Sequence, residues 1–331
     1  MTDRALAIAF WAISCVLVGC GGGDDAWTDS SPHEVSFVTV PGDVSLEVLD
    51  WGGSGPAMVF LAGLGNMAHA FDEFAPRFLD EYRVMAVTRR GFGASADPES
   101  GYDHETLAAD VVAILDAKGV ERAVLLGHSI AAVELTTLGS RYPERASNLV
   151  FLDTHCFAPE LRARLQALFG SLSRGVPQSV PSHSDTTTAE GYVAFVHQSR
   201  GVPIPEADIR ARYTFDGWEE TRRAAYRDIL QMAFQLPLTC NEIQVPSLAL
   251  VGYRTEIAQE EPAIRADSTF WEEQRAFQRG YRDIVRMLEE EFPSWIPDSK
   301  AIAIEGGHHW VFASHPDEVE GHIRDFLDTR Q

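Results

Sequence analysis

The sequence of 331 residues has little positive charge. Its 27 lysines and arginines stand against 49 aspartates and glutamates, which gives a formal net charge of −22, and the only lysines are Lys118 and Lys300. Because binding of a nucleic-acid backbone needs clustered lysine and arginine side chains, we expect no nucleic-acid partner. The acidity bears on solubility and association rather than on chemistry, so it leaves the activity open.

Long hydrophobic runs are also lacking, and one short run stands at the amino terminus. Arg4 precedes the apolar stretch 5–18, which is the layout of a secretory signal and is short for a membrane span of about 20 residues. Residues 17–20 resemble the lipobox of bacterial lipoproteins. The sequence therefore predicts a signal peptide over 1–19 and a lipid anchor at Cys20, on a membrane of the bacterial cell envelope. An ordinary secretory signal with a secreted product is the alternative.

Cysteine is scarce, with four in the chain. Cys15 lies in the predicted signal and Cys20 is the predicted acylation site, so Cys156 and Cys240 remain for the folded part. An oxidising compartment permits a disulfide between them. We nevertheless expect two buried thiols, because Cys156 follows the carboxyl end of one predicted strand and Cys240 precedes the amino end of another. That order places them at opposite edges of a sheet.

Short apolar runs alternate with helix-period stretches along the chain, which is typical of a mostly parallel sheet with helices on both faces. The expected strands are eight: 35–40, 45–51, 57–61, 83–88, 123–126, 149–152, 248–251 and 301–304. Residues 41–43, Pro-Gly-Asp, predict an antiparallel hairpin between the first two. The amphipathic stretch 104–118, which ends before Gly119, predicts a helix.

One segment is too long for a single crossover helix. Residues 154–238 contain several amphipathic pieces, so we expect a helical cap inserted over the carboxyl edge of the sheet. The segments 34–153 and 239–331 then form the core that carries the eight strands. Residues 20–33 begin with a glycine-rich stretch and are expected to be a flexible tether.

A short motif follows the fifth predicted strand. Residues 127–131, Gly-His-Ser-Ile-Ala, come after the apolar run 123–126 and open the helical stretch 132–142. A serine in such a strand-to-helix turn, with small residues two before and two after it, is typical of a nucleophile elbow, so Ser129 is the predicted nucleophile. Ala131 stands where the usual pattern has glycine. A serine that only caps a helix is the alternative.

Two further segments carry a resemblance to a known family. Residues 62–65, Ala-Gly-Leu-Gly, stand where that family has its HGxG loop, and residues 88–95 resemble its D-x-R-G-x-G-x-S turn, with Thr88 and Arg89 as departures. With the elbow, these segments resemble the α/β-hydrolase superfamily in the expected order from Ser45 onward. The resemblance implies an α/β fold of the α/β-hydrolase type, with an eight-stranded mostly parallel sheet, helices on both faces and an inserted helical cap.

That resemblance also implies an oxyanion hole. Acyl transfer forms a tetrahedral oxyanion, which two backbone N–H groups can stabilise. We assign these donors to Leu64 and Ile130. Ala62 replaces the family's usual histidine, which changes the side-chain contacts of the loop but leaves its backbone donors available.

A catalytic histidine is expected after the last strand, because a serine hydroxyl needs a base. His308 and His309 follow one another there. The family has a proline seven residues after its catalytic histidine, so Pro316 favours His309 over His308. Consecutive histidines rarely bind one ion, and no carboxylate or cysteine cluster accompanies them, so we expect no metal site and no cofactor.

The acid that orients the histidine has two candidates. Most of the superfamily supplies it after the seventh strand, where Thr255 stands at the expected position and Glu256 comes one residue late. Some members, such as haloalkane dehalogenases, supply it from the place of Asp153, directly after the predicted strand 149–152. Because a triad is defined by geometry rather than by sequence position, Asp153 is favoured and Glu256 stays open.

A serine nucleophile narrows the chemistry that the resemblance implies. Dehalogenases and epoxide hydrolases of this fold attack through an aspartate at the elbow, and Ser129 argues against both. The residues predict a carboxylesterase-like hydrolase that cleaves a small-molecule ester through an acyl-enzyme. A catalytically inactive or very narrow-specificity binding protein of the cell envelope, with the same fold, is the alternative. The substrate and the oligomeric state stay open.

Overall fold

The computed structural model describes residues 27–156, 158–171, 181–215, 219–220, 224–234, 238–254 and 268–328. The chain forms two compact units, Met1–Ser30 and Ser31–Gln331, and every described helix and strand belongs to the second. The predicted signal peptide, its acylation site Cys20 and the alternative acid Glu256 lie outside the described residues. In the part of the chain that is described, no helix combines the length and the apolar character needed to cross a membrane.

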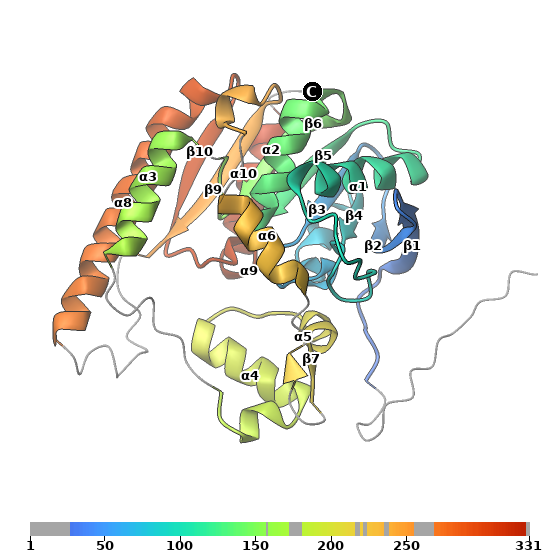
Figure 1. Cartoon of the computed structure of the whole chain (residues 1–331), viewed down its shortest axis with the longest axis horizontal. Helices are drawn as coiled ribbons and strands as arrows, with labels where there is room; N and C mark the ends of the chain where they lie inside the picture. Colours follow the sequence, from blue (N-terminus) through green and yellow to red (C-terminus); the bar gives the residue numbers. More distant parts are fainter. Residues whose placement is uncertain are drawn as a thin grey trace, which may run out of the picture. The chain divides into compact units, whose positions relative to one another are not determined.

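An eight-stranded sheet runs through the second unit in the order β1-β2-β4-β3-β5-β6-β9-β10 (Figure 1). Its strands are β1 (Glu34–Val40), β2 (Val44–Gly52), β3 (Ala57–Leu61), β4 (Arg83–Val87), β5 (Ala123–His128), β6 (Ala146–Leu152), β9 (Ser247–Tyr253) and β10 (Lys300–Glu305). β2 pairs antiparallel with both β1 and β4, and all other pairs are parallel. The predicted eight-stranded, mostly parallel sheet and its first hairpin are confirmed.

Helices cover both faces of this sheet because the central strands are apolar on both sides. β3 is buried along its whole length, with Val59 in one core cluster and Phe60 in the other. One face packs against α1 (His104–Ala117), α2 (Ala132–Arg141) and α8 (Ser268–Trp295). The other packs against α10 (Pro316–Asp328) and the short helices η1 (Ala68–Phe71) and η2 (Ala75–Phe78). The sheet thus lies between two helical layers. Because β4, β3, β5, β6, β9 and β10 are parallel, their carboxyl ends lie along one edge of it.

The segment between β6 and β9 supplies helices on two sides of the core. α3 (Pro159–Gly170) packs along α8, where the Phe169 and Phe277 ring centroids lie 5.2 Å apart (Figure 1). α4 (Ala189–Arg200), α5 (Glu206–Arg212), the short strands β7 (Tyr213–Thr214) and β8 (Glu219–Glu220), and α6 (Ala224–Phe234) follow. Ile229 of α6 shares an apolar cluster with Leu64 and Ile130, so α6 covers the predicted oxyanion positions.

A disulfide joins Cys156 to Cys240 across 84 residues, which corrects the expectation of two free thiols. The expectation placed Cys240 at the amino edge of the sheet, next to β9. Instead, the chain crosses the molecule between Cys240 and β9: Leu238 packs with Val133 at the start of α2, and Gln244 N donates to Gly139 O near its end. Cys240 therefore lies on the same side as Cys156, and the bond closes the base of the inserted segment.

Candidate active site

The turn after β5 holds Ser129 in a strained conformation. Ser129 begins the short helix η3 (Ser129–Ala131), and its φ of +54° lies in the left-handed region, which costs a side-chain-bearing residue about 1–3 kcal/mol. A Cβ atom on Gly127 would lie 2.8 Å from Leu135 Cδ1 and 3.0 Å from Ala131 Cβ, so the turn accepts only small residues there. Strand, strained serine and helix follow one another as in a nucleophile elbow.

Asp153 and His309 meet at the edge where the parallel strands end. Asp153 directly follows β6, and its Oδ2 lies 2.7 Å from His309 Nδ1. Its Oδ1 accepts a hydrogen bond of 2.7 Å from Gly252 N on β9, which fixes the carboxylate between the two strands. Asp153 also has a positive φ, +48°, so the chain turns sharply to aim this side chain. Asp153 thus lies beside His309, whereas the other predicted acid, Glu256, lies outside the described residues.

The two adjacent histidines have different surroundings. His309 contacts Asp153, and its side chain is 47% exposed. His308 instead stacks on Trp310, with ring centroids 5.3 Å apart at an interplanar angle of 11°. The loop that carries both lies close to β9, since a Cβ on Gly252 would lie 2.8 Å from Gly307 C. A side chain on Gly252 would therefore push the loop away from the strand.

His128 connects the elbow with two neighbouring loops, a role that the sequence did not signal. Its Nε2 lies 2.7 Å from His309 O, to which it donates in the tautomer protonated at Nε2. A Cβ on Gly63 would lie 2.6 Å from His128 Nδ1, so the loop 62–65 rests directly on this ring. Burial, and after it the neighbouring His309, lowers the pKa of His128 well below its usual value. His128 is therefore a neutral spacer between the loop and the His309 backbone.

Arg89, a departure from the family's turn, is a buried side chain that bonds to the backbone of the loop 62–65. Its Nη2 donates to Ala62 O at 2.9 Å, and its Nε donates to Glu134 in the first turn of α2. The Arg89 and Glu134 side chains are 6% and 4% exposed. Arg89 thus contacts the residue that replaces the family's histidine and ties it to the helix that follows Ser129.

The inserted segment also reaches the loop beside Leu64. Asp208 of α5 accepts 2.7 Å hydrogen bonds from Asn66 Nδ2 and from Met67 N. Asn66 Oδ1 in turn accepts a 3.4 Å bond from Trp310 Nε1, next to His309. Burial raises the pKa of Asp208, against the lowering effect of these two bonds. Sequence reasoning missed this network because its members lie more than 100 residues apart.

The chain matches a family model described as alpha/beta hydrolase fold over residues 56–273. The 2-(acetamidomethylene)succinate hydrolase of Mesorhizobium japonicum is 30% identical over 184 residues, 55% of this chain and 62% of that protein. The 3-oxoadipate enol-lactonase 2 of Acinetobacter baylyi is 30% identical over 122 residues, 37% of this chain and 46% of that protein. The matched segments thus span less than two thirds of either relative. A crystal structure of E-2-(acetamidomethylene)succinate hydrolase superposes with a TM-score of 0.62 at 21% identity, covering 89% of this chain and 99% of that one, and so shares its fold.

Proposed function

Because the chain belongs to the α/β-hydrolase fold family, we propose that it is a serine hydrolase that cleaves carboxylic esters through an acyl-enzyme. The observation that carries the proposal is the 2.7 Å contact between Asp153 Oδ2 and His309 Nδ1, at the edge where β5 presents Ser129. A carboxylate, an imidazole and a serine in this relation are the parts of a catalytic triad.

Each of these residues has a defined task in the proposed reaction. With Nδ1 of His309 donating to Asp153, the other ring nitrogen, Nε2, is the base that takes the proton of Ser129. Ser129 Oγ then attacks the ester carbonyl, and the alcohol leaves with the proton that His309 returns. Water repeats the sequence on the acyl-enzyme and releases the acid, and no cofactor is required.

The oxyanion is stabilised by backbone N–H groups of Leu64 and Ile130 in this proposal. Ile130 follows Ser129 at the start of η3, as the family's second donor does, and Leu64 packs in the same apolar cluster. Three contacts hold the loop that carries Leu64. Arg89 donates to Ala62 O, the His128 ring packs against Gly63, and Asp208 accepts a hydrogen bond from Met67 N. Such support matters because an oxyanion donor must already point at its target when charge develops.

A small-molecule ester agrees with the name of one of the two relatives. The Acinetobacter baylyi protein is an enol-lactonase by name, and a lactone is a cyclic ester. The Mesorhizobium japonicum protein is by name a hydrolase of 2-(acetamidomethylene)succinate, which has an acetamide and no ester, so its name supports acyl hydrolysis in general. Leu64 and Ile130 are partly buried against a cluster that contains the fully buried Ile229, and this apolar setting suits an acyl chain rather than a charged group.

Export and a lipid anchor at Cys20 belong to the same proposal. Their support is the signal-like layout of residues 1–19 and the lipobox-like residues 17–20. The Cys156–Cys240 disulfide adds support, because disulfides persist in oxidising compartments such as the bacterial periplasm. The mature enzyme would then act at a membrane surface of the cell envelope.

Hydrolysis of a p-nitrophenyl ester series, from acetyl to long acyl chains, tests the proposed activity. Turnover should depend on acyl-chain length, and both Ser129→Ala and His309→Ala should lose it. A fluorophosphonate probe, which labels only an activated serine, should label the unmodified protein and not Ser129→Ala.

Two outcomes would replace this proposal. Labelling of Ser129 without turnover of any ester would mean a narrow-specificity hydrolase with another acyl substrate. Neither labelling nor turnover would favour the envelope binding protein, in which the triad residues are present but Ser129 is not activated.

A further inference from the structure

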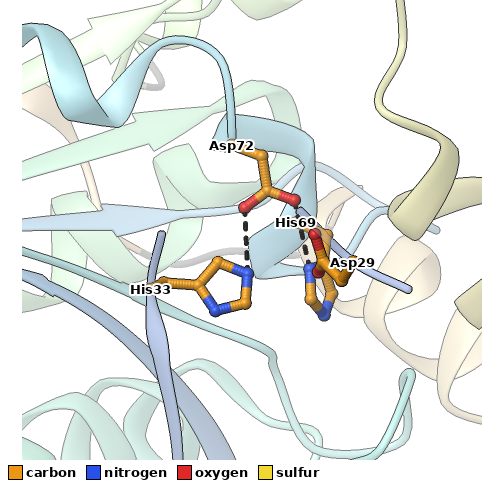
Figure 2. A group of neighbouring side chains, drawn as sticks. All are labelled: Asp29, His33, His69 and Asp72. Carbon is orange, nitrogen blue, oxygen red and sulfur yellow. Dashed lines mark hydrogen bonds and ion pairs between the residues drawn. The ribbon is translucent and has the colours of Figure 1, made fainter. Parts of the chain in front are cut away.

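Two imidazoles flank one buried carboxylate beside the first strands of the sheet. His33 Nε2 lies 3.3 Å from Asp72 Oδ1, and His69 Nδ1 lies 3.2 Å from Asp72 Oδ2, so the two rings approach opposite oxygens of the same side chain (Figure 2). Ligand atoms of the three residues all lie within 4.8 Å of one another. Asp29, which the figure also labels, belongs to the unit Met1–Ser30. The donor set within the hydrolase unit is therefore two histidines and one aspartate.

Two carboxylates gather in this place, and among the described residues no lysine or arginine pairs with either of them. The side chains of Asp72 and Glu47, on β2, are 7% and 6% exposed. Over the described residues, the ion pairs of both carboxylates are made with histidine alone. In the same residues, Asp72 Oδ1 accepts no hydrogen bond, and its 3.3 Å contact with His33 is an ion-pair contact. Buried carboxylates are costly unless a cation compensates them.

We propose that His33, His69 and Asp72 bind one divalent transition-metal ion of the zinc type, with water as the fourth ligand. Two imidazoles and one carboxylate are a donor set that zinc accepts, and imidazole favours zinc, copper, iron or nickel over magnesium and calcium. The ion would supply two positive charges to a place that holds two buried carboxylates. Charge compensation and donor chemistry thus point to the same class of ligand.

Each histidine–carboxylate contact has about the spacing of two ligands on one tetrahedral ion, although the two histidines approach different oxygens of Asp72. Ligands that lie about 2.0–2.1 Å from a tetrahedral zinc ion are about 3.3–3.4 Å apart. The contacts of 3.2 and 3.3 Å fall beside this value, and the 3.2 Å contact between His69 Nδ1 and Asp72 Oδ2 also has the length of a hydrogen bond. To bind one ion, the two imidazoles and the Asp72 carboxylate would have to turn toward a common point, with ligand atoms that lie within 4.8 Å of one another.

Glu47 lies near the ring nitrogen of His69 that would not bind the proposed ion. Metal-binding histidines commonly present their second ring nitrogen to a carboxylate, which fixes the tautomer. His69 turns Nδ1 toward Asp72 and Nε2 toward Glu47 Oε1, 4.0 Å away. Glu47 is itself held, because its Oε2 accepts a 2.6 Å hydrogen bond from Thr88 Oγ1. At 4.0 Å the contact is electrostatic rather than a hydrogen bond, so Glu47 would favour a cationic or metal-bound His69 through its charge.

The proposed ion would brace the loop that carries Leu64. Thr88 Oγ1, which donates to Glu47, also accepts a 3.0 Å hydrogen bond from Ala68 N at the start of η1. η1 follows the loop 62–65 within a few residues and contains His69. The site therefore joins the segment before β1, through His33, to the helix directly after the predicted oxyanion loop. The ion stabilises this junction and takes no part in the reaction.

Metal content and zinc binding of the purified full chain test the proposal. After treatment with a chelator, calorimetric titration with zinc chloride should give one equivalent per chain, and saturation should raise the midpoint of thermal unfolding by about 5 °C. His33→Gln and His69→Gln should lose the equivalent, with folding checked by circular dichroism. Glu47→Gln should bind about 10- to 100-fold more weakly, since it removes only the charge of the carboxylate near His69.

His322→Gln is the matched control, because His322 lies on α10 and pairs with Glu318 at 3.8 Å. It should bind zinc as the unmodified chain does. The proposal is overturned if the unmodified chain binds no zinc up to about 100 µM, an affinity too weak for a built site. It is equally overturned if folded His33→Gln keeps the full equivalent, since the ion would then lie elsewhere, for example beside His309.

Discussion

At the scale of single residues, the site depends on backbone strain as much as on side-chain chemistry. Ser129 and Asp153 both have positive φ, at +54° and +48°, and both directly follow a parallel strand. Strain of this kind persists only where the surroundings hold it, and here Asp153 is held by Gly252 N and Gly127 leaves room beside Ser129. The two sharp turns bring side chains from β5 and β6 to one edge.

Asp153→Asn should remove the acid without changing the shape of its side chain. The amide can still occupy the left-handed conformation, but it offers His309 Nδ1 a neutral partner and favours the wrong tautomer. We expect kcat on the best p-nitrophenyl ester to fall by about 10³ to 10⁴, with KM little changed. Asp298→Asn is the control, since Asp298 is exposed and has a similar φ of +55°. Equal activity of the two variants would rule out Asp153 as the triad acid.

Arg89→Met should destabilise the fold, because it leaves Glu134 as a buried carboxylate without its guanidinium. The expected loss in the free energy of unfolding is about 3–5 kcal/mol, measured by urea denaturation at neutral pH. The double variant Arg89→Met/Glu134→Leu should recover most of this loss, since apolar replacement of a whole buried pair is about neutral. Both variants lose the bond to Ala62 O, so both should have lower kcat. A double variant no more stable than the single one would contradict this account.

Residue patterns predicted part of this site and not the rest. Ser129 and His309 stand in local motifs of five or six residues, which a sequence displays directly. The choice between Asp153 and Glu256 depends on which carboxylate reaches His309, a distance that spacing along the chain does not give. Arg89, as a departure from the family's turn, was visible in the sequence, whereas its bonds to Ala62 and Glu134 join segments 27 and 45 residues away.

At the scale of elements, hydrophobic period and end signals account for the core. Helix α1 begins after Asp103, whose side chain accepts from Thr106 N at 2.9 Å, and it ends before Gly119 with a φ of +67°. These signals placed the predicted helix 104–118 within one residue of its observed bounds. Strand ends were predicted less accurately. The apolar run predicted a strand over 149–152, whereas β6 begins three residues earlier, at Ala146.

Asp103→Ala should cost about 1 kcal/mol of stability at pH 7, the usual value of an N-cap. Burial is the largest single influence on Asp103 and raises its pKa, but the bonds from Thr106 N and Oγ1 together bring the pKa below its ordinary value. A folded-state pKa below the unfolded one means that the contribution is present above the unfolded pKa of about 4 and lost as pH falls through the folded pKa.

The measurement for this prediction is the difference in unfolding midpoint between the unmodified chain and Asp103→Ala, from pH 7 down to pH 3. The difference should shrink as the pH falls. Asp103→Asn keeps a capping oxygen without a titrating group, so its midpoint should stay above that of Asp103→Ala at every pH. A difference that is constant with pH would mean that the ionised carboxylate contributes nothing to the cap.

At the scale of the whole molecule, the inserted segment is bound to the core at several places. α3 packs on α8, Asp208 of α5 bonds to the loop after Leu64, and α6 packs on the cluster around Ile130. The sequence predicted a helical insertion because residues 154–238 are too many for one crossover helix and contain several amphipathic pieces. It did not predict how the chain returns to β9 along α2, and that return is why the two cysteines meet.

The Cys156–Cys240 disulfide should therefore act on the molecule as a whole. It closes a loop of 84 residues that contains the inserted helices, and a cross-link of this span is worth about 2–5 kcal/mol, chiefly by restricting the unfolded chain. Adding a reductant should lower the urea midpoint of the unmodified protein and leave the variant Cys156→Ala/Cys240→Ala unchanged. Because α6 covers the predicted oxyanion positions and lies inside the closed loop, ester turnover should fall at a lower urea concentration once the bond is reduced. If reductant shifts neither the unfolding midpoint nor the loss of turnover, packing of α3 and α6 alone holds the insertion on the core.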